Sequence, residues 1–183
     1  MIASSTTAAL AAERWYALAV LSRQEKAAQG DLARRGFDAF LPVRVERRAW
    51  SDRIKAIELA LFPGYVFVRT ALDTVRRVEL LKVRGAHELV GRIPGDARIA
   101  RAIPDDEIES LRAVVMADRA IDPVTRLVPG MRVRVARGPL AGASGVLEQS
   151  VDGQRRLVVM VALLGRGVRA RLSADDVLEE LAA

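Results

Sequence analysis

The sequence predicts an α+β fold, in which an antiparallel sheet flanked by helices is followed by a small all-β barrel. Three observations support this prediction. Up to residue 116, strand-like and helix-like periods are mixed, and strands follow one another through hairpins as well as helices. Residues 117–127 carry no periodic apolar face. From residue 128 onward, about five short strands alternate with glycine-containing turns, the scale of an SH3-like barrel.

These observations divide the chain into four parts. We expect a disordered tail at residues 1–13, a first domain at 14–116, a linker at 117–127 and a second domain at 128–183. The tail contains no Lys or Arg and so lacks the positive region of a secretion signal. The longest apolar runs are shorter than the ~20 residues that span a bilayer. A cytoplasmic monomer without a membrane partner is therefore expected.

The first domain opens with a strand at Trp15 to Val20. The pattern Ser22-x-x-Glu25 matches a capping box, which predicts a helix from there to about Arg35, ended by Gly36. Pro42 interrupts the next strand, at residues 37–45, and confines it to an edge or a bulge. The basic run at residues 44–55 is expected to be a solvated hairpin.

Two further helices are expected in this domain. Asp73 and Thr74 can cap a short helix whose Val75, Val78 and Leu81 would share the inner face. A strand at residues 87–90 follows. Pro104 and the acids after it predict the start of the last helix, which would bury Ile108, Leu111 and Val115.

The strongest local signal is the stretch Phe62-Pro63-Gly64-Tyr65, which leads into a strand ending at Thr70. Pro63 and Gly64 predict a type II turn that leaves Phe62 at its rim. On the strand, Tyr65 and Phe67 must share one face, and the intervening valines the other. If helices cover only one side of the sheet, an aromatic cluster lies open, and such a patch usually marks a partner site.

The second domain reads as strands at residues 131–136, 145–147, 157–164, 168–172 and 177–179. Asp152-Gly153 is a strong hairpin signal. Gly138, Pro139 and Gly142 oppose a helical alternative. We therefore predict a domain that is always β, moves independently on its linker and leaves the aromatic cluster open.

Charge and residue composition limit the classes of function that the chain can have. The chain carries a formal charge of +6 with a pI near 10.6, which favours polyanionic partners. It contains no cysteine and one histidine, His87, so disulfides, thiol nucleophiles and His-rich metal sites are excluded. No phosphate loop or nucleophile elbow is present, and the acid pairs at residues 105–106 and 175–176 suit a helix start and a turn. We expect no enzyme, cofactor or metal.

Two sequence motifs, which follow one another in the same order as in a known family, resemble that family. The glycines and valines from Gly130 to Leu147 resemble the KOW motif, and Phe62 to Tyr65 resembles the F-P-G-Y turn of the NusG N-terminal (NGN) domain. Over residues 14–180 the chain resembles the NusG/RfaH family of transcription elongation factors. Ala19, Leu140, Ala143 and Leu164 depart from the residues of some members.

The resemblance implies that the first domain binds RNA polymerase at the β′ clamp helices and the β gate loop, suppresses pausing and modulates termination and antitermination. The KOW domain would recruit further partners, a small-subunit ribosomal protein or Rho. The implied polymerase-binding residues are Tyr16, Phe62, Pro63, Tyr65, Phe67, Arg76, Arg77 and Val78. The implied contacts with non-template DNA are Arg84 and Arg23, and the implied KOW contacts are Leu163, Leu164 and Arg166.

Two alternatives stay open. The chain could be a housekeeping factor or a specialised, operon-directed paralogue. It could also be a KOW-type RNA-binding protein associated with the ribosome. That second alternative requires a strongly basic barrel, whereas residues 128–183 carry eight arginines against six acids.

Overall fold

The computed structural model describes residues 12–49, 54–91, 100–117, 121–124, 130–149 and 154–181. In the first domain the elements are β1 (Arg14–Val20), α1 (Glu25–Arg34), β2 (Asp38–Phe40), β3 (Val43–Ala49), β4 (Ile54–Ala60), β5 (Tyr65–Thr70), α2 (Thr74–Leu81), β6 (Ala86–Leu89) and α3 (Asp105–Met116). The second contains β7 (Ile121–Val124), β8 (Met131–Arg137), β9 (Ser144–Gln149), β10 (Arg155–Val161), the 3-10 turn η1 (Ala162–Leu164), β11 (Arg166–Arg171) and β12 (Val177–Glu180).

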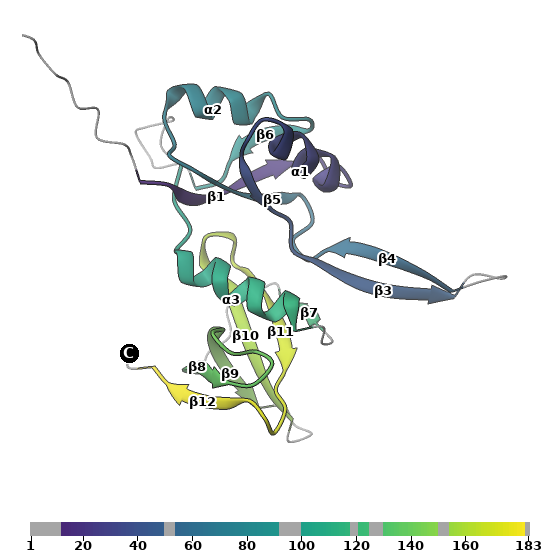
Figure 1. Cartoon of the computed structure of the whole chain (residues 1–183), viewed down its shortest axis with the longest axis vertical. Coiled ribbons are helices and arrows are strands. Elements are labelled where there is room, and N and C mark those ends of the chain that lie inside the picture. Colours follow the sequence, from purple (N-terminus) through teal and green to yellow (C-terminus); the bar gives the residue numbers. More distant parts are fainter. Residues whose placement is uncertain are drawn as a thin grey trace, which may run out of the picture.

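The first domain is built on an antiparallel sheet with the strand order β2-β5-β1-β6. Helices α1 and α2 lie against one face of this sheet and α3 against the other (Figure 1). Val66 and Val68 belong to the core under α1 and α2, and Phe67 belongs to the core under α3. The alternation predicted for β5 is confirmed, and because helices cover both faces of the sheet, the condition for an open aromatic cluster is not met.

Helix α1 begins differently from the predicted capping box. It starts at Glu25 after an N-cap residue, Gln24, whose side chain makes no capping hydrogen bond. Arg23 has a φ of +67°, which places it in a tight turn closed by the Gln24 N–H donating to the Leu21 carbonyl. This turn removes Ser22 from the capping position. The predicted stop at Gly36, with a φ of +77°, is confirmed.

Helix α2 is capped as predicted, since the Asp73 carboxylate accepts the Arg76 N–H at 2.7 Å. Its predicted inner face is wrong. Val75 and Val78 are exposed, and Leu80 is the residue of this helix that is fully buried. The guanidinium of Arg76 lies 5.2 Å from the centre of the Phe37 ring, so cation–π stacking supplies part of the packing instead.

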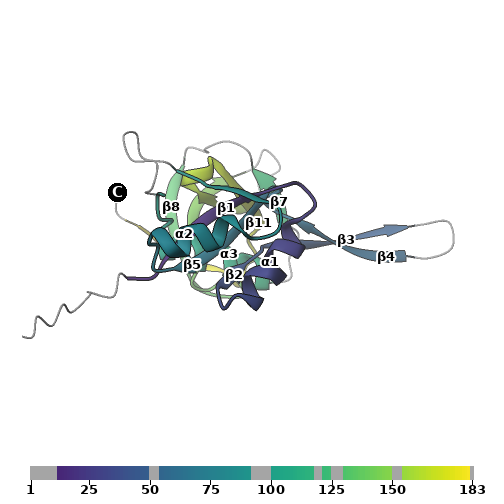
Figure 2. The same ribbon diagram turned by 90° about the horizontal axis from the view of Figure 1, so that it is seen from above.

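Strands β3 and β4 form a separate two-stranded ribbon that projects from the domain (Figures 1 and 2). Pro42 separates β3 from β2, which is an edge strand as predicted. The predicted solvated hairpin is confirmed for its described residues, and residues 50–53 of the predicted run lie outside them.

The second domain is a six-stranded antiparallel sheet with the order β12-β8-β9-β10-β11-β7. The five predicted strands are present, but the third ends at Val161, and residues 162–164, predicted as its end, form the turn η1. Asp152-Gly153 lies outside the described residues. The sixth strand, β7, pairs with β11 and falls inside the predicted linker at 117–127. Residues 121–124 therefore belong to the β domain, because the pairing edge of β11 supplies the hydrogen bonds that four residues alone could not make.

Helix α3 joins the two domains. One continuous hydrophobic core includes Phe62 and Phe67 of the sheet, Ile108 and Leu111 of α3, and the interior of the β domain. Ser110 is buried on the same helix, and its Oγ accepts the Ser144 N–H of the β domain at 2.8 Å. The prediction that the β domain leaves the aromatic cluster open is wrong for this structure.

Candidate binding surface between the two domains

The Phe62–Tyr65 turn is held by hydrogen bonds to the N–H and the carbonyl of Gly64. Gly64 has a φ of +85°, and the Tyr65 N–H donates to the Phe62 carbonyl, as predicted for a type II turn. The Gly64 N–H donates to the carboxylate of Glu25 at 2.8 Å, and its carbonyl accepts the Val20 N–H at 2.8 Å. Because Glu25 is buried, its charge-assisted bond locks the turn to the start of α1.

Five aromatic side chains gather on the α3 side of the sheet, and we call them the aromatic face: Trp15, Phe40, Phe62, Tyr65 and Phe67. The rings of Phe62 and Phe67 meet edge to face with centroids 5.5 Å apart. The rings of Phe40 and Phe67 lie 6.3 Å apart. Sequence reasoning found three of these residues and missed Trp15 and Phe40.

Tyr16 is a predicted polymerase-binding aromatic residue that the structure does not bring to this face. It pairs with Val68 on β5 and belongs to the core under α1 and α2. Its burial raises the pKa of the phenol above its ordinary value. Alternation along β1 could have identified Trp15 in its place, since Trp15 and Ala17 must point opposite to Tyr16.

The aromatic face is covered. Phe62 and Phe67 have no exposed surface, and Trp15 is 4% exposed. The guanidinium of Arg112 on α3 lies 4.9 Å from the Trp15 ring centre and 5.0 Å from that of Phe40. Phe62 is therefore a core residue, and the prediction of an exposed rim aromatic is wrong.

Three contacts bring the segment Ala162–Arg166, which we call the docking loop, to the first domain. The Ala162 N–H donates to the Glu107 carboxylate of α3 at 3.1 Å. Leu163 reaches Gly91, where a Cβ atom would lie 2.8 Å from the Leu163 Cδ1. The Arg166 guanidinium lies 5.5 Å from the centre of the Tyr65 ring. The three residues implied as KOW contacts, Leu163, Leu164 and Arg166, are thus all part of the docking loop.

The docking contact at Glu107 has an electrostatic cost. Burial raises the pKa of this carboxyl, and the negative charge of Asp106 raises it further. The Ala162 hydrogen bond and Arg132 lower the pKa but do not offset burial. The docking hydrogen bond from the Ala162 N–H itself favours the ionised carboxylate, against the effect of burial.

A cleft of about 790 Å³ lies beside the Phe62–Tyr65 turn, between the first domain and the β domain. It brings together Arg23, Pro63 and Arg166 from the predicted sites. Leu61, Pro123 and Val124 supply apolar lining. The turn is therefore partly accessible, although Phe62 itself is not.

The other predicted residues lie away from the aromatic face. Arg76, Arg77 and Val78 are on α2, on the opposite side of the sheet (Figure 1). Arg76 pairs with Glu79 at 3.6 Å, and Val78 is 45% exposed. Arg84 follows α2, and its N–H donates to Asp31 at 3.0 Å. These residues form a surface separate from the aromatic face.

Within the described ranges, no group of three or more His, Cys, Asp or Glu side chains is arranged to hold a metal ion. In the same part of the chain, no helix is both long and apolar enough to cross a membrane.

Comparison with known proteins identifies similar chains. Residues 13–112 match the family model described as NusG, transcription termination factor nusG. The transcription termination/antitermination proteins NusG of Staphylococcus carnosus and Staphylococcus aureus strain Mu50 are each 23% identical over 175 residues, covering 91% of this chain and 95% of the relative. A solved structure, titled domain interaction in Thermotoga maritima NusG, matches with a TM-score of 0.53 and 16% identity over 93% of this chain and 98% of that one. This last likeness shows a shared fold.

Proposed function

The chain belongs to the NusG family of transcription termination factors, and we propose that it is an elongation factor that binds RNA polymerase through the aromatic face. In this proposal the Phe62–Tyr65 turn contacts the β′ clamp helices, and the α2 surface with Arg76, Arg77 and Val78 contacts the β gate loop. Arg23 and Arg84 contact non-template DNA. Bridging the two polymerase subunits would suppress pausing and so affect termination and antitermination.

The observation that carries the proposal is the contact between Tyr65 and Arg166. It joins the aromatic face to the docking loop, so the candidate polymerase site and the candidate KOW partner site cover each other. A surface rich in aromatic rings is typical of a protein interface, and burying it against a second domain keeps it from unspecific contacts. Polymerase binding would then require the docking loop to leave, which frees Leu163, Leu164 and Arg166 for a ribosomal protein or Rho.

Substitutions on the two sides of this contact are expected to have opposite effects on binding to immobilised RNA polymerase core. Tyr65→Ala removes an interface ring and should weaken binding by about tenfold or more. Arg166→Ala uncovers the same ring and should strengthen binding. Equilibrium binding of each purified variant to the polymerase core measures both.

His87→Ala serves as the control, because it removes an exposed ring on the edge strand β6 and should leave binding unchanged. Purified ribosomal RNA provides the comparison for the ribosome-associated alternative. If Tyr65→Ala bound polymerase as tightly as wild type while remaining folded, or if ribosomal RNA bound better than polymerase, the proposed function would be wrong.

A further inference from the structure

A row of cationic side chains follows helix α1 on the surface of the first domain. Arg34 and Arg35 lie at its C-terminal end, and Arg23 lies in the turn before its first residue. Lys82 and Arg84 belong to the segment that follows α2. All five residues are exposed, and we call them the basic strip.

Hydrogen bonds hold the segment after α2 along the length of α1. At one end the Arg35 guanidinium donates to the Lys82 carbonyl at 3.4 Å. At the other end the Leu21 N–H donates to the Gly85 carbonyl at 2.9 Å, beside the Arg23 turn. The five cations therefore line one path, whose length is set by the ten residues of α1 and is about 15 Å.

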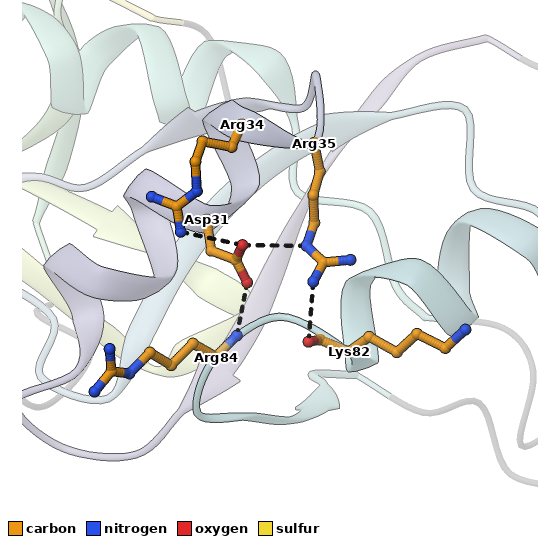
Figure 3. Close-up of polar contacts among 5 residues, drawn as sticks. All are labelled: Asp31, Arg34, Arg35, Lys82 and Arg84. Carbon is orange, nitrogen blue, oxygen red and sulfur yellow. Dashed lines mark hydrogen bonds and ion pairs between the residues drawn. The ribbon is translucent and has the colours of Figure 1, made fainter.

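Asp31 lies between the C-terminal end of α1 and the segment after α2 and contacts both (Figure 3). One carboxylate oxygen accepts the Arg84 N–H at 3.0 Å. The other lies 3.3 Å from a nitrogen of Arg34 and 3.3 Å from a nitrogen of Arg35. With both oxygens occupied and 15% of its side chain exposed, Asp31 presents little negative charge to a ligand.

The same contacts keep Asp31 ionised. The hydrogen bond from the Arg84 N–H lowers the pKa of this carboxyl, and the guanidinium groups of Arg35 and Arg34 lower it further, against a raising effect of burial. The carboxylate is therefore available at neutral pH to orient both arginines.

We propose that the basic strip binds the phosphate backbone of a single DNA strand, with Asp31 as the positioning residue that holds the guanidinium groups of Arg34 and Arg35 beside the Arg84 backbone. This inference rests on the proposed function, which assigns Arg23 and Arg84 to non-template DNA. It adds Arg34, Arg35 and Lys82 to that site. It also gives the acidic residue Asp31 a positive effect on DNA binding, although its negative charge alone would repel phosphate.

The chemistry of the strip favours phosphate over bases. Arginine forks match phosphate oxygens in a paired geometry, and four of the five cations are arginines. A path of about 15 Å is long enough to contact more than one phosphate of a single strand. None of the five side chains is aromatic, so the strip offers no ring on which bases could stack. Binding should therefore not depend on base sequence.

The test measures fluorescence anisotropy of a labelled single-stranded 12-nucleotide DNA with the full chain and no polymerase. Removing an acid from a basic site should strengthen DNA binding if charge alone matters. Asp31→Ala is instead expected to weaken it by about threefold, because Arg34, Arg35 and Arg84 lose their common anchor. Arg34→Ala with Arg84→Ala should lower the slope of log affinity against log salt by about 0.7 for each phosphate that the variant no longer neutralises.

Asp38→Ala is the matched control, since Asp38 is an exposed acid on β2 that pairs with Arg112 at 3.8 Å, outside the strip. It should leave affinity unchanged or raise it. Asp31→Asn keeps an acceptor for the Arg84 N–H but loses the negative charge that orients Arg34 and Arg35. It tests the positioning role of Asp31 if Asp31→Ala does not fold, and it is expected to bind DNA more weakly than wild type. Tighter binding by Asp31→Asn, or a preference among 12-mers of different sequence, would overturn the inference. Polymerase binding is measured separately, so failure of the DNA site is distinguishable from failure of the proposed function.

Discussion

The double variant Glu107→Ala, Ser110→Ala is expected to bind RNA polymerase at least about tenfold more tightly than the wild-type chain. These two side chains of α3 accept the Ala162 and Ser144 N–H groups of the β domain. The Ser144 N–H is partly buried, so losing its Ser110 acceptor costs the docked arrangement about 1–3 kcal/mol, whereas the exposed Ala162 N–H can bind water in place of Glu107. The fraction of molecules with an accessible aromatic face rises accordingly, and apparent affinity rises with that fraction.

Two measurements check this result. Equilibrium binding to polymerase core gives the affinity, and backbone NMR relaxation shows whether the two domains tumble together or separately. The matched control is Asp105→Ala, Glu109→Ala, which removes two exposed acids from the same helix and should change neither. Separated domains with unchanged polymerase affinity would contradict the proposed masking.

The second large effect is on stability. Phe62→Ala is expected to lower the free energy of unfolding by about 3–5 kcal/mol, because the ring is fully buried against Phe67 and the cavity left behind cannot collapse completely. For a chain of 183 residues this corresponds to a fall in Tm of about 10 °C. Thermal unfolding followed by circular dichroism measures it.

Val75→Ala is the control for this experiment, since the Val75 side chain is 66% exposed and its truncation should cost about 0.5 kcal/mol or less. A Phe62→Ala variant as stable as Val75→Ala would mean that Phe62 sits at an open rim, as the sequence suggested. The same reasoning makes Tyr65, which is half-buried at the edge of the aromatic face, the better probe of polymerase binding.

Local features of the fold could be predicted from the sequence, whereas features set by distant elements could not. The turn at Pro63-Gly64, the alternation along β5 and the stop at Gly36 follow from φ preferences and side-chain periodicity, which act over a few residues. Burial of Phe62 depends on which element packs over the sheet, and alternation assigns a side chain to a face without saying what covers that face. Strand β7 could not be predicted for the same reason. It forms because the edge of β11 is available for pairing, and β11 lies more than 40 residues later in the chain.

Two sets of polar residues carry roles that the sequence concealed. The Ser22-x-x-Glu25 spacing predicted a helix cap, but the positive φ of Arg23 turns Glu25 toward Gly64 instead. On α3, Glu107 and Ser110 share the apolar side of the helix with Leu111 and Val114. A polar residue on an apolar stripe needs a partner, and this signal could have pointed to the docking contacts with the β domain.

The most direct test of the proposed masking uses the absence of cysteine from the chain. The Ser110 Oγ lies 2.8 Å from the Ser144 backbone nitrogen, so Ser110→Cys with Ser144→Cys places two thiols across the contact between α3 and the β domain. Binding of the oxidised and reduced forms to polymerase core is compared, with each single substitution under the same oxidant as control. Masking predicts that the cross-linked protein fails to bind and that reduction restores binding. Equal binding by the oxidised and reduced forms would contradict the claim that the β domain covers the polymerase-binding face.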